Sequence, residues 1–120
     1  MKIRIKGNSI RLRLTKSEVA LFCAEGSCSE TIDFGTSSLT YTLTTKEGIT
    51  DLDADYSGNQ ITVYMPMEAK QNWYTSNRVG YSSTVAKETG NELAILVEKD
   101  FICMDETIED QSDIYPNPMM

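Results

Sequence analysis

Alternating hydrophobic and charged residues open the chain and predict a β-hairpin. Ile3 and Ile5 alternate with cations, a Gly-Asn-Ser turn follows at 7–9, and the alternation resumes from Ile10 to Leu14. A period of two is typical of strands that bury one face only. We therefore expect two paired strands whose apolar side chains point inward, so that five cations share the outer face.

A short helix should follow this hairpin. Thr15 and Glu18 have the spacing of a capping box, in which the two residues satisfy free backbone N–H groups at the start of a helix. Val19 and Phe22 then fall on one helical face, and Gly26 ends the helix. Two strands are expected next, at 31–34 and 39–43, with Ile32, Phe34, Leu39, Tyr41 and Leu43 inward.

The same pattern recurs later in the chain and predicts a second, similar half. Residues 7–22 match residues 58–73 at a constant offset of 51, which places Ile10 on Ile61 and aligns the aromatic residues that close the two helices, Phe22 and Trp73. The second half should begin near Asp53, with Ala54 and Tyr56 in the places of Ile3 and Ile5, an inward set of Ile61, Val63 and Met65, a helix at 67–75, and strands near 78–83 and at 92–101.

These elements predict an α+β fold: a β-rich, barrel-like single domain of two pseudo-symmetric ββαββ halves with two short helices. A repeated unit that cannot bury its apolar face alone is expected to pack against its copy. We expect a globular domain at 1–103, half-units at about 2–43 and 53–98, and an acidic C-terminal tail at 104–120. The expected core is Ile3, Ile5, Ile10, Leu12, Leu14, Val19, Phe22, Ile61, Val63, Trp73, Ile95 and Val97.

Charge is distributed unevenly along the 120 residues. The first 16 residues hold six of the 11 cations and no acid, so they carry +6, whereas the rest holds five cations and 18 acids, or −13; together these give the net −7. An acidic protein repels nucleic acid overall, although a local basic patch can still bind it. No apolar run approaches about 18 residues, and the N-terminus lacks the hydrophobic stretch of a secretory signal. We expect a cytoplasmic protein that does not enter a membrane.

Catalytic and metal-binding chemistry finds little support. The chain has no histidine and no recognisable nucleophile or phosphate-binding motif, so we expect no enzyme and no cofactor, although 18 acids leave a carboxylate pair open. Cys23, Cys28 and Cys103 are interpreted as reduced thiols, with a metal or redox pair as the alternative. Asp51, Asp53 and Asp55 resemble the start of a calcium loop, but Tyr56 and Thr62 replace its required glycine and glutamate.

The opening segment resembles the AbrB/MazE-type swapped-hairpin domains. Gly7, Asn8, Ser9 and Arg13 match that family's motif over roughly residues 2–43, while Thr15 stands where the family usually has proline. The resemblance implies a barrel of two such units, typically from two chains, that binds DNA. One observation argues against DNA binding. The residues of the second half that align with Lys2 and Arg4 are aspartates, Asp53 and Asp55. The residues that would bind nucleic acid or a partner are Lys2, Arg4, Lys6, Asn8, Arg11 and Arg13.

The chain as a whole resembles a small bacterial protein family of unknown function. That family opens with MKIRIKGNSIRLRLTKSEV-like text and ends with LVEKDF-x-C, an acidic stretch and PNP. The resemblance implies no activity. We expect a non-catalytic binding or interaction domain whose partner the sequence does not identify, a protein being one candidate; the alternative is a DNA-binding, antitoxin-like regulator, which the net charge disfavours. We also expect the basic hairpin to be neutralised within the molecule, by Asp53 and Asp55 or by the acidic tail.

Overall fold

The computed structural model describes residues 1–100, which form two helices and eight strands, and this confirms the α+β class. The predicted tail at 104–120 and Cys103 lie outside the described residues. The chain order is β1 (Lys2–Lys6), β2 (Ser9–Leu14), α1 (Lys16–Glu25), β3 (Ser27–Asp33), β4 (Ser38–Lys46), β5 (Asp53–Ser57), β6 (Gln60–Pro66), α2 (Met67–Asn72), β7 (Gly80–Ala86) and β8 (Glu92–Lys99). This order is the predicted ββαββ pattern, present twice.

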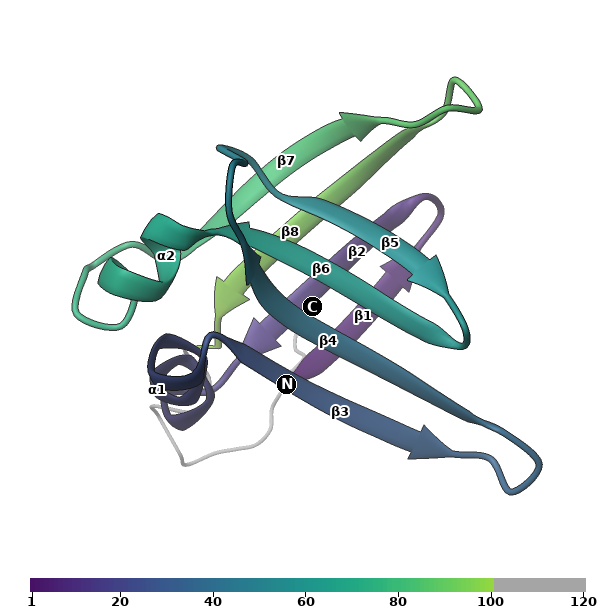
Figure 1. The fold of residues 1–120 in the computed structure, drawn as a ribbon, viewed down its shortest axis with the longest axis horizontal. Coiled ribbons are helices and arrows are strands. Elements are labelled where there is room, and N and C mark those ends of the chain that lie inside the picture. Colours follow the sequence, from purple (N-terminus) through teal and green to yellow (C-terminus); the bar gives the residue numbers. More distant parts are fainter. Residues whose placement is uncertain (101–120) are drawn as a thin grey trace, which may run out of the picture.

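Two four-stranded sheets result, because each half gives one hairpin to each sheet. The first sheet has the order β1-β2-β8-β7 and the second has the order β3-β4-β6-β5. The hairpins are antiparallel, and the central pairs β2–β8 and β4–β6 are parallel. Figure 1 shows the second sheet in front of the first, with both helices at one end of the molecule. The two halves are thus interleaved rather than placed side by side.

The two parallel junctions have matching registers. Ile10 pairs with Ile95 across β2 and β8, and Ile61 pairs with Tyr41 across β6 and β4. Ile61 is the counterpart of Ile10 at an offset of 51. Because the side-chain period of a strand is two, a slip of one residue at either junction would turn the apolar set outward. Equivalent inward residues of the two halves therefore occupy equivalent places at the two junctions.

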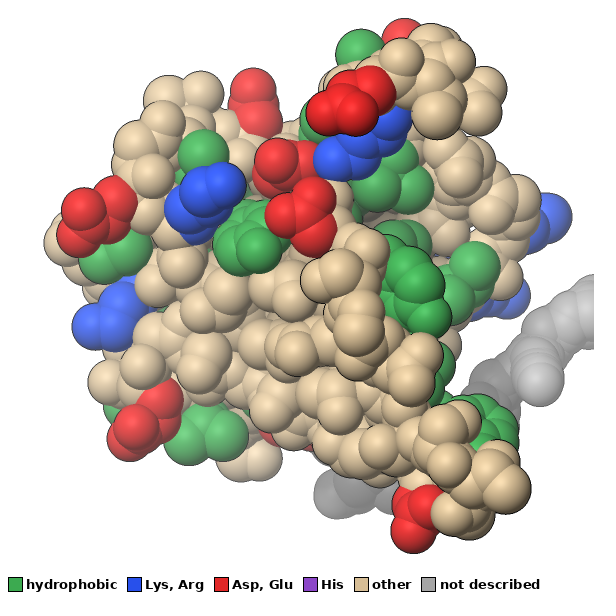
Figure 2. All heavy atoms as spheres, turned by 45° about the vertical axis from the view of Figure 1, so that its right-hand side comes forward, with side chains coloured by type: hydrophobic (Ala, Val, Ile, Leu, Met, Phe, Trp, Pro, Cys, Tyr) green, Lys and Arg blue, Asp and Glu red, His purple; other side chains and the backbone are tan. Residues whose placement is uncertain are grey.

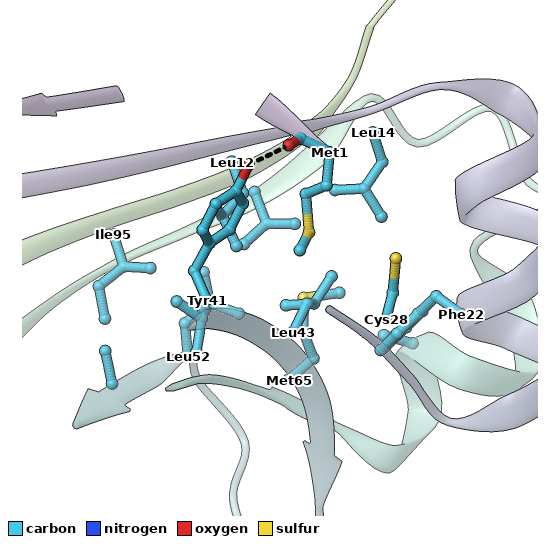
Figure 3. Close-up of a cluster of buried hydrophobic side chains, with 14 of the residues drawn as sticks. Met1, Leu12, Leu14, Phe22, Cys28, Tyr41, Leu43, Leu52, Met65 and Ile95 are labelled. Atoms are coloured by element: carbon cyan, nitrogen blue, oxygen red, sulfur yellow. Dashed lines mark hydrogen bonds between the residues drawn. The ribbon is translucent and has the colours of Figure 1, made fainter. Parts of the chain in front are cut away.

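The core lies between the sheets and extends to the helices. Phe22 and Trp73 are both 0 % exposed, and their rings meet edge to face with centroids 6.2 Å apart. The Trp73 ring contacts Tyr81 in the same way, at 5.6 Å. Figure 3 shows Tyr41 directed at Met1, whose carbonyl oxygen accepts a 2.7 Å hydrogen bond from the tyrosine hydroxyl. The predicted core residues that are buried are Leu12, Leu14, Val19, Phe22, Ile61, Val63, Trp73, Ile95 and Val97.

Three inward assignments are wrong, and all three residues lie toward the hairpin tips. Ile5 is 59 % exposed, and Ile32 and Phe34 are 41 % and 65 % exposed. The β3–β4 hairpin extends past the opposite sheet at its tip (Figure 1), so residues there have nothing to pack against. Tyr56, the counterpart of Ile5, is also exposed, at 65 %. Ile3 and Ile10 pack at the margin of the core and are partly buried.

The barrel-like arrangement is not a closed barrel: the described strands form two open sheets. The edge strands are β1 and β7 in the first sheet and β3 and β5 in the second. Two twisted sheets that pack face to face can bury a common apolar layer without hydrogen bonds between their edges. Here the helices cover one end of that layer, and the hairpin tips diverge at the other.

The helix boundaries follow their capping residues. The Thr15 backbone N–H donates to the Glu18 carboxylate at 2.8 Å, and the Thr15 hydroxyl accepts from the Glu18 N–H at 3.3 Å, which confirms the capping box. Gly26 closes α1 with a φ of 87°, in the left-handed region that glycine tolerates. Helix α2 begins after Pro66 and ends at Asn72, earlier than the predicted 75.

Candidate functional site

The outer side of the β1–β2 hairpin carries a cluster of cations that we call the cationic face. In the antiparallel register Lys2 lies opposite Arg13, and Arg4 lies opposite Arg11. Residues that alternate on a strand share one side of the sheet, and the inward positions of β1 and β2 are apolar. The face comprises Lys2, Arg4, Lys6, Arg11 and Arg13.

A shallow hollow extends the cationic face across the first sheet. Arg11 pairs with Leu96 of β8, and Leu96 pairs with Ser82 of β7. The hollow has a volume of about 790 Å³ and is bounded by Arg4 and Lys6 on one side and by small hydroxyl side chains of β7 on the other. The hollow is therefore bordered by cations on the β1–β2 side, and the rest of its surface is uncharged, with hydroxyl groups and one leucine.

Two acids neutralise part of this charge. One Glu98 carboxylate oxygen, Oε2, lies 2.8 Å from the Arg13 Nε and 3.1 Å from the Arg11 Nε. Lys2 pairs with Asp100 at 3.2 Å. Within residues 1–100, five cations thus meet two acids, which leaves +3. Of the other two cations on the face, neither makes an ion pair with a described residue.

Arg11 is incompletely satisfied. Its Nε is buried and has no hydrogen-bond partner among the described residues, although the Glu98 oxygen is close. Arg13 makes the hydrogen bond to that oxygen. A buried donor without an acceptor is uncommon in folded proteins, and here the nearby Glu98 carboxylate compensates the charge of Arg11 without accepting a hydrogen bond from its Nε.

The sequence predicted two partners for the basic hairpin that the structure places elsewhere. Asp53 lies on β5 of the second sheet and pairs with Lys87 at 3.0 Å. Burial alone would raise the pKa of Asp53, but the hydrogen bonds from Lys87 and from the Ala54 N–H, together with the nearby positive charges, outweigh it and hold the pKa below its usual value. Asp55 also lies on β5. The hairpin therefore obtains its acids from the end of β8 and not from β5.

Asn8 does not belong to the cationic face. Its side-chain amide donates to the Glu92 carbonyl at 2.6 Å, and its own carbonyl accepts from the Ala94 N–H at 3.1 Å. Both contacts tie the β1–β2 turn to the start of β8. Asn8 therefore positions the hairpin that carries the cations, and five of the six predicted site residues are brought together.

The corresponding outer side of the second sheet has different chemistry. Asp53 and Asp55 occupy the positions of Lys2 and Arg4, and threonines fill the middle of the sheet. Figure 2, which views this side obliquely, shows a broad area without charged side chains. The hydroxyls bond to neighbours, as Thr31 does to Thr40 at 2.9 Å. Of the two related outer faces, only that of the first sheet is cationic.

A second hollow opens between the hairpin tips, at the end of the molecule opposite the helices. It has a volume of about 560 Å³ and is lined by exposed Ile5 and Tyr56, with Ile61 and Leu93 deeper inside. Figure 2 shows hydrophobic side chains gathered around this opening. Ile5, which sequence periodicity placed in the core, thus lines a separate, mainly apolar concavity together with Tyr56.

The described cysteines and acids show no other site. Cys23 and Cys28 are free thiols, and burial raises the pKa of Cys28, which disfavours its reactive thiolate. Within residues 1–100, no three histidine, cysteine or acidic residues are grouped to hold a metal ion. Neither described helix has the length and apolar character needed to span a membrane.

The fold and the face together define a small α+β domain of two interleaved ββαββ units with one cationic sheet face. Residues 1–119 match the model of a family described as "Family of unknown function (DUF7009)", and the chain belongs to that family. The sequence prediction of a small family of unknown function is thereby confirmed. Comparison with curated proteins gives no match, and comparison with solved structures gives none.

Proposed function

We propose that this protein is a non-catalytic binding domain whose cationic face binds an acidic segment of a partner protein. The observation that carries the proposal is the +3 that remains on this face of a protein whose net charge is −7. Arg4 and Lys6 are exposed and form no ion pair with any residue in 1–100. An anionic partner would supply the missing acids to both side chains.

The geometry of β1 favours an extended polypeptide. β1 is an edge strand, so its outward backbone groups can pair with an added strand. Arg4 and Lys6 alternate on it, which separates them by about 6.6 Å along the strand. Acidic side chains at alternate positions of an extended peptide have the same spacing. Backbone pairing would supply affinity, and the cations would select acidic sequences.

DNA binding is the second candidate. The basic hairpin and its Gly-Asn-Ser turn resemble those of the DNA-binding swapped-hairpin domains, and arginines suit phosphate contacts. However, a symmetric DNA reader needs cations on both related faces, and here Asp53 and Asp55 replace Lys2 and Arg4. A face with a net +3 would also release few counterions, which limits affinity at physiological salt. An acidic peptide is therefore the better match.

The test is a binding titration with two probes at two ionic strengths. One probe is a fluorescent peptide with glutamate at alternate positions, and the other is a DNA duplex, each at about 50 and about 200 mM salt. The double variant Arg4→Ala with Lys6→Ala should weaken peptide binding about tenfold, which corresponds to about 1.4 kcal/mol. Glu98→Gln should strengthen binding, because it removes an acid from the face.

A matched control keeps the net charge change the same. Lys16→Ala with Lys46→Ala removes two exposed cations that lie off the cationic face. This control should bind the peptide within about twofold of the parent, since distant exposed charges are screened. Equal losses in both double variants would show that only net charge matters and would overturn the proposal. Tighter binding to duplex than to peptide at the higher salt would favour the DNA-binding regulator.

A further inference from the structure

We infer that the acidic C-terminal segment of this same chain, residues 101–120, docks on the cationic face and competes there with the partner. The docking is independent of the proposed function, whereas the competition rests on it. Three observations support the inference: where the described chain ends, which charges follow, and how far they can reach.

The described chain ends beside the cationic face. The Asp100 backbone N–H donates to the Leu14 carbonyl at 2.8 Å, and its carboxylate pairs with Lys2 at 3.2 Å. Asp100 is 4 % exposed. These contacts fix residue 100 at the end of β2 and next to the start of β1. The described chain therefore ends at the margin of the face, and the two cations that have no ion pair with a described residue lie further along β1.

The segment that follows has the complementary charge. It contains five acids and no cation, or −5, so that residues 1–100 account for the other −2 of the net −7. The +3 face is thus carried by a domain that is itself slightly acidic. The acids of the segment are Asp105, Glu106, Glu109, Asp110 and Asp113.

The length of the connection suits this docking. The first acid follows Asp100 by five residues, which can span about 16 Å when extended. β1 itself has five residues and is about 17 Å long. The acids can therefore reach both Arg4 and Lys6 without strain. A tether of this length gives an effective concentration in the millimolar range, so even weak individual pairs can occupy the face.

A chemical cross-link tests the docking directly. A zero-length carbodiimide reagent joins lysine amines to carboxylates in contact, and mass spectrometry maps the product. We expect Lys6 to cross-link to the acids at 105–113 more often than Lys46, which lies on the second sheet. Higher salt should reduce the Lys6 product. Equal yields at the two lysines would overturn the inference.

Isotope labelling separates docking within one chain from docking between two chains. In an equal mixture of labelled and unlabelled protein, docking within one chain gives cross-linked products in which both peptides carry the same label. Mixed-label products in the statistical proportion would show exchange between copies and would overturn the inference.

The competition is tested with the acidic peptide probe. Replacing the five acids at 105–113 by their amides should tighten peptide binding at least about fivefold, a typical coupling between linked sites. A control with the same charge change at five exposed acids of the domain should tighten it less. Those control positions are Glu25, Glu47, Asp51, Glu68 and Glu88.

The two proposals can fail separately. Lys6 cross-links without binding of the peptide probe, in the parent or in the amide variant, would support the docking and overturn the proposed function. Peptide binding that depends on Arg4 and Lys6, without preferred Lys6 cross-links, would support the function and overturn the docking. Equal effects of the amide variant and its control would overturn the competition.

Discussion

Truncation of Phe22 should remove a central contact of the core. Its side chain is 0 % exposed, and its ring meets Trp73 edge to face at 6.2 Å and 83°. Phe22→Ala therefore removes a fully buried aromatic ring and leaves a cavity between the two helices. Such truncations cost about 3–5 kcal/mol, and about 0.5–1.5 kcal/mol of this is attributable to an aromatic pair.

The size of this expected loss in unfolding free energy determines how it is measured. Domains of this size have unfolding free energies of about 5–15 kcal/mol, so the alanine variant retains little stability or does not fold. With a urea dependence of about 1–3 kcal/mol per molar, the midpoint should fall by about 2 M. Phe22→Leu, which keeps most of the volume, should cost less than about 1.5 kcal/mol and keeps the test usable if the alanine variant does not fold.

A neighbouring residue on the same helix provides the control. Leu21 is 48 % exposed, so Leu21→Ala should cost less than about 1 kcal/mol. Combining Phe22→Leu with Trp73→Leu in a double-mutant cycle should give a coupling of about 0.5–1.5 kcal/mol. If Phe22→Ala costs no more than Leu21→Ala, or if the coupling is zero, the assignment of this pair to the core centre is refuted.

Two further predictions concern stability. Burial alone would raise the pKa of Glu18, but hydrogen bonds and the positive charge of the Met1 ammonium outweigh it and lower the pKa from 4.5. The stabilisation is present above that value and is lost as pH falls through the lowered folded pKa. Urea unfolding should therefore show Glu18→Gln destabilising at pH 7, with the difference from the parent shrinking as the pH falls below 4.5. At Gly80 an added Cβ would lie 2.3 Å from the Val97 carbonyl oxygen, so Gly80→Ala should cost about 1–3 kcal/mol in the same assay, and an unchanged midpoint would contradict that close approach.

Local patterns in the sequence predicted the elements but not their partners. The alternation from Lys2 to Leu14 and the capping pair at 15 and 18 gave the first hairpin and helix, because both signals reside in neighbouring residues. The parallel pairing of β2 with β8 joins residues about 85 positions apart, such as Arg13 and Glu98. Periodicity reports which side of a strand is buried and carries no information about the adjacent strand.

The same limit explains the errors in the core. Alternation grouped Ile5 and Ile32 with the inward residues of their strands, yet both are exposed. Whether an inward residue is buried depends on whether the opposite sheet extends over it, and that depends on hairpin lengths in three dimensions. The cationic face was predictable because it needs only one hairpin. Its acid, Glu98, was not, because it comes from the other half of the chain.

Equivalent residues of the two halves are alike on the inward side of the sheets and differ on the outward side, and this difference bears on where a ligand binds. Inward counterparts keep their character, as Ile10 and Ile61 do at the two parallel junctions. Two outward counterparts reverse sign: Asp53 and Asp55 occupy on β5 the positions that Lys2 and Arg4 occupy on β1, and the counterparts of the other three cations are uncharged. Packing requires the inward match, since both junctions face one core, but it places no demand on the outward charge. A ligand that used the pseudo-two-fold axis would require equal outer faces. The reversal therefore argues that a ligand binds only one of the two outer faces. Titration of the acidic peptide should give one site per chain. Two equivalent sites would contradict the assignment of the cationic face.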